Sequence, residues 1–343
     1  MVSIVRWTVI PYKKLFLAYR LRRNLRRNLF KQLGVRRFMD NQPTGHHNHA
    51  GFLSPLKNLY ERHYAALLFI TIMMTVLAFA QIGYQYYTTG DFIHRGVSLK
   101  GGVIITVPDA VVDQDALESD LRVAFHNSDL QVRTIQATKG VSIEAADVSA
   151  DELVAKVSSR LGGLEKDQYS VEVIGSSLGK SFFKELFFSI GLAYVLMGIV
   201  VLLFYRTIVP SAAVITCAFC DMICTVAVYN LTGRTMSSAG IAALLMLIGY
   251  SVDTDMLLTS RVLRRKEGTV MDRVYSAFST GTTQTMAAIA AVTVALFVTH
   301  SDVIREVMTV LLIGLFIDFP MTWIQNAAMI RKYMEGRTHE HKN

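Results

Sequence analysis

The sequence predicts an α-helical polytopic membrane protein with six membrane spans and one folded α+β domain between the first two spans. Three observations predict this class: a high apolar content, six long apolar stretches, and one acidic segment with a mixed helix and strand pattern. Of the 343 residues, 52% are hydrophobic and 18% are charged, whereas about 25% of a soluble domain is charged. The chain is too apolar to be soluble throughout and too polar to lie entirely in a bilayer.

Six stretches are long enough to cross a bilayer, because a spanning helix needs about 20 mostly apolar residues. The expected spans are Tyr64–Tyr84, Leu186–Tyr205, Pro210–Tyr229, Ser238–Leu258, Ala277–Thr299 and Val307–Met329. The first begins too far into the chain, and is too long, to be the apolar part of a cleaved signal peptide. The spans leave a basic N-terminal extension (1–63), a segment outside the membrane (90–178), a bundle (186–329) and a basic tail (330–343).

Basic residues gather on one side of this predicted topology. Residues 1–63 contain 13 Lys and Arg but only two acidic residues, and the links after the second and fourth spans and the tail are also basic. Residues 90–176, with 14 acidic and eight basic residues, face the other side. Because the side richer in Lys and Arg is normally cytoplasmic, we expect a protein of the cell membrane with both termini in the cytoplasm. The charge follows the topology, so no nucleic-acid partner is expected.

The segment outside the membrane alternates between strand and helix patterns. Period-two alternation predicts strands, and apolar residues three or four positions apart predict helices. In chain order the expected elements are Val103–Val107, Asp113–His126, Leu130–Ile135, Val141–Ala145, Ala150–Leu161 and Tyr169–Ile174. Their order is βαββαβ, the split βαβ arrangement.

Carboxylates inside the predicted spans are the main candidates for function. Asp221 and Asp318 lie near mid-depth in two spans, Asp253 lies in the cytoplasmic half of a third, and a fourth span brings Gln284 and Thr285. Ionised groups in hydrocarbon are costly and usually face the bundle interior. A proton relay is one interpretation; aspartates that hydrogen-bond helices together and an ion site are the others.

The neighbouring Asp255 is assigned to a different position from Asp253. Two residues along a helix are separated by roughly 200° of rotation, so both cannot face one site. Because Asp255 is nearer the predicted cytoplasmic end of its span, we expect it at the membrane boundary. The prediction therefore groups Asp221, Asp253 and Asp318.

Other features point to binding rather than catalysis. Cys217, Cys220 and Cys224 share one helix face, where a metal or redox pair is conceivable, but cysteine is also an ordinary small residue of membrane helices. A histidine cluster (His46, His47 and His49) fits a linker better than a metal site. The basic stretch 20–37 could lie on anionic lipids; contact with ribosomal RNA or with another protein is the alternative. No nucleotide-binding or catalytic motif is present, so no enzyme activity, cofactor or metal is expected.

Short motifs then indicate a family. Gly249-Tyr250-Ser251-Val252-Asp253, followed by Arg261, resembles the G-Y-S-[IV]-[ND] signature of the SecF family, and its archaeal branch most of all. Gly101 and Gly102 resemble the family's Gly-Gly motif where the external domain begins. The resemblance extends over residues 64–332. Bacterial members carry Asp where this chain has Thr254, and Arg where it has Gln284.

The resemblance implies half of an RND-type bundle with an external ferredoxin-like domain. It also implies a role in protein export with SecD and the SecY channel, coupled to the proton gradient and acting on unfolded preprotein. Two alternatives stay open: an uncoupled structural or chaperone-like subunit that binds emerging chains, and one half of an RND-type exporter of small molecules or lipids.

Overall fold

A computed structural model of the chain describes residues 54–110, 112–125, 130–135, 140–146, 148–265, 268–299 and 301–340. The chain divides into two compact units, 1–62 and 63–343. The second unit contains the six apolar spans and every strand found among the described residues. The histidine cluster and the basic stretch 20–37 lie outside the described residues, so their interpretations stay predictions.

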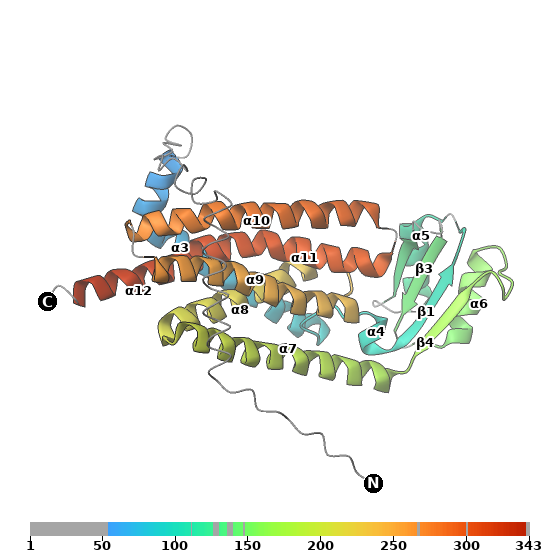
Figure 1. The fold of residues 1–343 in the computed structure, drawn as a ribbon. Coiled ribbons are helices and arrows are strands. Elements are labelled where there is room, and N and C mark those ends of the chain that lie inside the picture. Colours follow the sequence, from blue (N-terminus) through green and yellow to red (C-terminus); the bar gives the residue numbers. More distant parts are fainter. Residues whose placement is uncertain are drawn as a thin grey trace, which may run out of the picture. The chain divides into compact units, whose positions relative to one another are not determined.

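Six helices are long and apolar enough to cross a membrane, which confirms the predicted polytopic class (Figure 1). They are α3 (Ser54–Thr89), α7 (Ser176–Tyr205), α8 (Ile208–Leu231), α9 (Ser238–Arg264), α10 (Val270–Val298) and α11 (Asp302–Pro320). The last continues through η1 (Met321–Asn326) into α12 (Ala327–Glu340). Several helices exceed the predicted spans; α7, for example, begins ten residues before Leu186. The apolar pattern marks only the part of a helix that matches the hydrocarbon.

The bundle has buried inner helices and exposed outer ones. Most of α8 and α9 is buried, whereas few residues of α3, α7 and α10 are fully buried, as expected for helices that face lipid. Glycines let helices approach closely: a side chain at Gly314 on α11 would collide with Leu247 on α9. Such contacts stabilise membrane bundles through packing rather than through the hydrophobic effect.

The domain between α3 and α7 has the predicted βαββαβ order. It consists of β1 (Gly102–Val107), α5 (Gln114–Phe125), β2 (Gln131–Ile135), β3 (Gly140–Ala145), α6 (Ala150–Arg160) and β4 (Ser170–Ile174). The strands pair antiparallel in the order β2-β3-β1-β4. Alternate residues of β1 pack against Leu121 of α5 and Leu153 of α6 in one core. We call this unit the sheet domain.

The glycine pair at the start of β1 lies in close contact with two other backbone segments. It follows the short helix α4 (Val97–Lys100). Gly101 has φ +88° and Gly102 φ +143°, values that residues with a side chain rarely adopt. A side chain at Gly101 would collide with the backbone of Ser176, the first residue of α7, and one at Gly102 with Ala145 on β3. The motif therefore fixes the junction between the sheet domain and the bundle.

Candidate functional site

Three inner helices bring three carboxyl groups together in the middle of the bundle. Asp221 on α8, Asp255 on α9 and Asp318 on α11 are 1%, 0% and 0% exposed. They are close enough to interact electrostatically. Within the described part of the chain, none of the three forms an ion pair with a basic side chain. We call this group the acid cluster.

Hydrogen bonds connect two members of the acid cluster to the segment that follows α11. Asn326 Nδ2 donates to Asp255 Oδ1 at 2.8 Å. The Thr322 hydroxyl lies 2.9 Å from the same oxygen and 3.2 Å from Asp318 Oδ1. A hydroxyl carries one proton and can also accept. If Thr322 donates to Asp255, it can therefore accept from a protonated Asp318, which makes a continuous path between two carboxyls.

A π-helix supplies these polar groups. Pro320 ends α11 without a backbone N–H to donate, and η1 follows it directly with wider π-helical turns. Thr322, Gln325 and Asn326 of η1 are all buried. Short π-helical segments inside α-helices frequently occur at functional sites. The sequence interpretation missed these residues; the available signal was three polar residues just after a proline in an apolar span.

Several oxygens of the acid cluster lack hydrogen-bond donors. Both carboxyl oxygens of Asp221, one of Asp255 and one of Asp318 have no hydrogen bond of normal geometry among the described residues. Ser251 on α9 is fully buried beside Asp221 and Asp318. Buried acceptors without partners are costly, and a proton on a carboxyl lowers that cost. The arrangement is therefore chemically suited to taking up protons.

The expectation that Asp253 joins Asp221 and Asp318 is wrong in its geometry. Asp253 lies on the exposed side of α9 with Ala242, Met246 and Gly249, and Asp255 is fully buried in the cluster rather than at a boundary. The separation of roughly 200° allows only one of the two aspartates to face inward, and the packing of α9 against α8 and α11 turns Asp255 inward. A role of Asp253 in a relay stays a prediction.

Comparison with known proteins identifies the family. The family described as "Protein export membrane protein SecD/SecF, C-terminal" matches residues 154–336. The protein-export membrane protein SecF of Pyrococcus furiosus is 36% identical over 283 residues, which cover 82% of this chain and 95% of that protein. SecF of Methanothermobacter thermautotrophicus is 35% identical over 283 residues and covers 81% and 95%. The chain belongs to the SecF family.

A solved structure has the same fold as this SecF-family chain. The crystal structure of SecDF, a translocon-associated membrane protein from Thermus thermophilus, superimposes with a TM-score of 0.64 at 16% identity. The match covers 82% of this chain and 41% of the solved one, so this chain spans less than half the length of SecDF. At this identity the likeness concerns the fold alone, and it agrees with the predicted half-bundle and its ferredoxin-like domain.

Tyr250 of the SecF signature lies between α9 and α10. The Tyr250 hydroxyl donates to the carbonyl oxygen of Gln284 on α10 at 3.4 Å and interacts electrostatically with both Asp318 and Asp253. Thr285 is fully buried, whereas the Gln284 side chain is exposed. Tyr250 is therefore the signature residue that connects the buried and the exposed sides of α9.

Two further signature positions are structural. Arg261 Nη1 donates to the Ser276 carbonyl at 2.5 Å and to its hydroxyl at 3.2 Å, and so ties the end of α9 to α10. A side chain at Gly249 would meet nothing within 4 Å. Neither residue is part of the acid cluster.

The three cysteines are free and buried on α8. Cys217 lies beside Asp255, and Gln325 Nε2 lies 3.5 Å from Cys220 Sγ. Among the described residues, no group of three or more His, Cys, Asp and Glu side chains is arranged to hold a metal ion. The thiols thus line one wall of the acid cluster.

Proposed function

We propose that this SecF-family chain is an accessory subunit of the Sec translocon that assists protein export across the cytoplasmic membrane together with SecD. Relatives named protein-export membrane protein SecF match over 95% of their length, which supports the export role. We also propose that export is coupled to the proton gradient. One observation carries the coupling: three fully buried carboxyl groups face one another without a basic partner among the described residues.

The chemistry of the acid cluster favours proton exchange. Two carboxylates that face each other without a cation repel when both are ionised, so a proton shared through Thr322 stabilises the pair. An ionised carboxylate in the hydrocarbon region costs several kcal/mol, so each change of protonation alters the packing of α8, α9 and α11. Such a change in helix packing would move the sheet domain, which is connected to the bundle.

SecD is the proposed partner for the exposed polar side of α9 and α10. Asp253, Thr280, Thr283 and Gln284 are exposed on this side. A charged residue facing lipid at the centre of a span costs roughly 2.5–3.5 kcal/mol on insertion scales, so a second membrane subunit is expected to cover it. The SecY channel, unfolded preprotein at the sheet domain, and anionic lipids at residues 20–37 are further proposed partners.

Orientation follows from the basic links. The positive-inside rule places Arg206, Arg261 and Arg273 in the cytoplasm, with both termini on that side. The sheet domain then lies outside, where exported chains emerge. No nucleic-acid contact and no enzyme activity are expected.

Export measurements on substituted protein test the coupling. Membranes containing Asp255→Asn should export preprotein slowly, and at the same rate with or without a proton gradient, because Asn keeps the shape but cannot exchange a proton. SecD should still co-purify. Asp253→Asn changes the same residue type two positions away, and its effect on gradient-dependent export shows whether the exposed aspartate also takes part in the relay. Normal gradient-dependent export in Asp255→Asn would remove the coupling proposal.

A second candidate is an uncoupled structural role, which the hydrogen bonds to Asp255 favour. Thr322 and Asn326 tie α9 to η1 through this carboxyl. In that case Asp255→Asn should lower the melting temperature of the purified protein first, and the export that remains should keep its dependence on the gradient. Melting temperature and gradient dependence measured on one preparation separate the two functions.

A further inference from the structure

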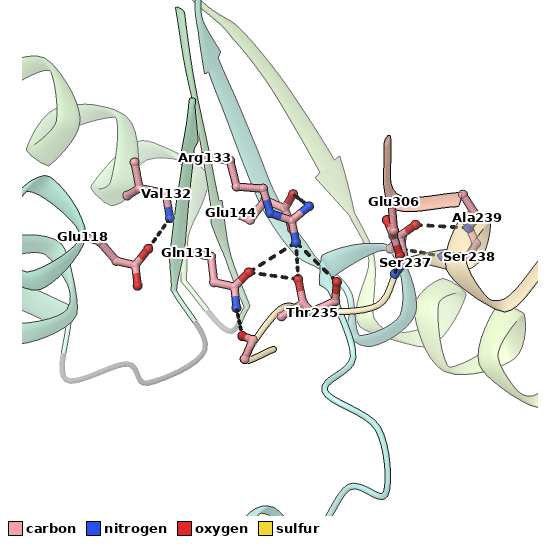
Figure 2. A network of polar contacts seen from close by, with 12 residues as sticks. Glu118, Gln131, Val132, Arg133, Glu144, Thr235, Ser237, Ser238, Ala239 and Glu306 are labelled. Carbon is pink, nitrogen blue, oxygen red and sulfur yellow. Dashed lines mark hydrogen bonds and ion pairs between the residues drawn. The ribbon is translucent and has the colours of Figure 1, made fainter. Parts of the chain in front are cut away.

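A polar network connects the sheet domain to the link between α8 and α9 (Figure 2). Arg133 on β2 donates from Nη2 to the Thr235 hydroxyl at 2.6 Å and to the Thr235 carbonyl at 3.4 Å. The Thr235 hydroxyl donates to Gln131 Oε1 at 3.0 Å. Gln131 Nε2 donates to the Gly233 carbonyl at 3.4 Å. Two side chains of one edge strand thus hold two residues of the link.

The bundle holds the same link from its other side. Glu306 on α11 is 7% exposed, and its Oε1 accepts the backbone N–H of Ser237 at 2.7 Å. Gly240 on α9 leaves no room for a side chain beside that carboxyl. The link is therefore fixed to α9 and α11, so that whatever the sheet domain binds at Thr235 is fixed to the bundle as well.

A carboxyl group of the sheet domain itself, Glu144, forms an ion pair with Arg133. Glu144 on β3 pairs with Arg133 at 3.4 Å, with its side chain only 17% exposed. Burial raises the pKa of Glu144; Arg133 lowers it, and the carboxylates of Glu306 and Asp302 on α11 raise it further. The net shift of this pKa is upward.

We propose that this contact is a proton-responsive latch, in which the sheet domain binds the link at Thr235 more tightly when Glu144 is protonated. The latch works at whichever side of the membrane carries the sheet domain, and it does not depend on the acid cluster. Its ligand is a single proton, and its readout is the position of the sheet domain relative to the bundle.

The direction of the pH effect depends on which charged groups belong to the sheet domain and which belong to the bundle. Arg133 belongs to the sheet domain, so its attraction for Glu144 is present whether or not the latch is closed. Glu306 and Asp302 belong to α11, so their repulsion acts only when it is closed. Arg234 in the link is exposed, and Gln131 and Thr235 are neutral. The other titratable residues that contact the link are Tyr229, whose hydroxyl donates to the Thr235 carbonyl at 3.2 Å, and His94, whose backbone carbonyl accepts the Met236 N–H. The closed form therefore binds the proton more tightly, and by linkage the latch strengthens as pH falls through the pKa of Glu144 and weakens above it.

Spin-label distances test the latch on the full chain in lipid nanodiscs. The three native cysteines are replaced by alanine, and labels are placed at Val123 on α5 (73% exposed) and Val303 on α11 (58% exposed). At low pH the distance distribution should be narrow, and it should broaden as pH rises. Identical distance distributions at low and at high pH would overturn the proposal.

Variants assign the response to its residues. Glu144→Gln mimics the protonated side chain and should give the narrow distribution at every pH. Glu306→Gln still accepts the Ser237 N–H but removes one repulsive charge, so the pH response should shrink. Glu152→Gln on α6, an exposed carboxyl of the same domain, should leave the response unchanged. An unaltered pH response in both Glu144→Gln and Glu306→Gln would refute the latch.

Discussion

The acid cluster and the latch are built from the same two helices but differ in one component. Asp255 and Asp318 in the cluster, and Ser237 and Glu306 at the latch, belong to α9 and α11 or directly precede them. The cluster has no cation among the described residues, whereas the latch has Arg133. A carboxyl group without a cation is neutralised most simply by a proton, and one beside an arginine can stay ionised. Helices α9 and α11 therefore join an interior of carboxyl groups without a cation to an outer contact whose carboxyl takes up its proton beside an arginine.

Removing the buried carboxyl at the centre of the cluster should have the largest effect. Asp255→Leu removes the acceptor nearest to Thr322 and Asn326 and leaves them the longer contacts to Asp318 Oδ1 at 3.2 Å and to Thr259 Oγ1 at 3.5 Å. A buried donor that loses its partner costs roughly 1–3 kcal/mol. Thermal unfolding of the purified chain in detergent measures the loss. Asp253→Leu, on the exposed side of the same helix, is the control and should not destabilise the isolated chain. Equal destabilisation by both variants would mean that the two aspartates have similar surroundings.

Adding a side chain at the junction between the sheet domain and the bundle should have the next largest effect. Gly101→Ala forces a side chain at φ +88° against the Ser176 backbone, and strained backbone positions cost about 1–3 kcal/mol. Gly163→Ala has a similar φ of +89° but open space around it, so it isolates the conformational part of the cost. The melting temperature should fall further for Gly101→Ala; if the two fall equally, the close contact at Ser176 has no energetic weight.

Removing the cation of the latch should loosen the contact without unfolding either region. Arg133→Met loses its hydrogen bonds to Thr235, and bonds that involve a charged group contribute about 1.5–3 kcal/mol each. Hydrogen exchange at the amides of residues 235–238 should become faster. Arg160→Met removes an exposed ion pair with Asp120, a kind worth about 0–1 kcal/mol, and should not change that exchange. Unchanged protection in Arg133→Met would show that the link is held by the bundle alone.

Replacing the shared hydroxyl of the cluster should have the smallest effect on stability. Thr322→Val keeps the shape but loses a hydrogen bond, at about 0.5–1.5 kcal/mol. Gradient-dependent export should be strongly reduced although the melting temperature changes little, because the path between Asp318 and Asp255 is interrupted. Thr309→Val on α11, whose hydroxyl donates to the Arg305 carbonyl of its own helix, is the control and should leave coupling intact.

Much of the fold was predictable because the signals for it are local. Runs of apolar residues marked all six membrane helices, and period-two and period-three-to-four patterns gave the strands and helices of the sheet domain within a few residues. Helix ends were less predictable: α7 extends to Ser176 through polar residues that no hydropathy pattern marks, because its first turns pack against α4 and the glycine pair.

The site was predictable only in part. Asp221 and Asp318 were identified from their depth in the spans, because a carboxylate in hydrocarbon usually faces the bundle interior; Asp253 is the exception. Thr322 and Asn326 were missed, since their inward position depends on the π-helix after Pro320. Arg133, Thr235 and Glu306 were missed as well, because they are far apart in the sequence and look like ordinary surface residues.

The sequence by itself determined the six spans, the βαββαβ order and the presence of Asp221 and Asp318 inside their spans, since hydrophobic burial and backbone hydrogen bonding act on neighbouring residues. Only the tertiary structure decided that Asp255 rather than Asp253 faces Asp221 and Asp318, and that Arg133 reaches Thr235. The rotation of a helix about its axis, and the seating of one domain on another, depend on the surfaces that pack against them, and no local pattern encodes those surfaces.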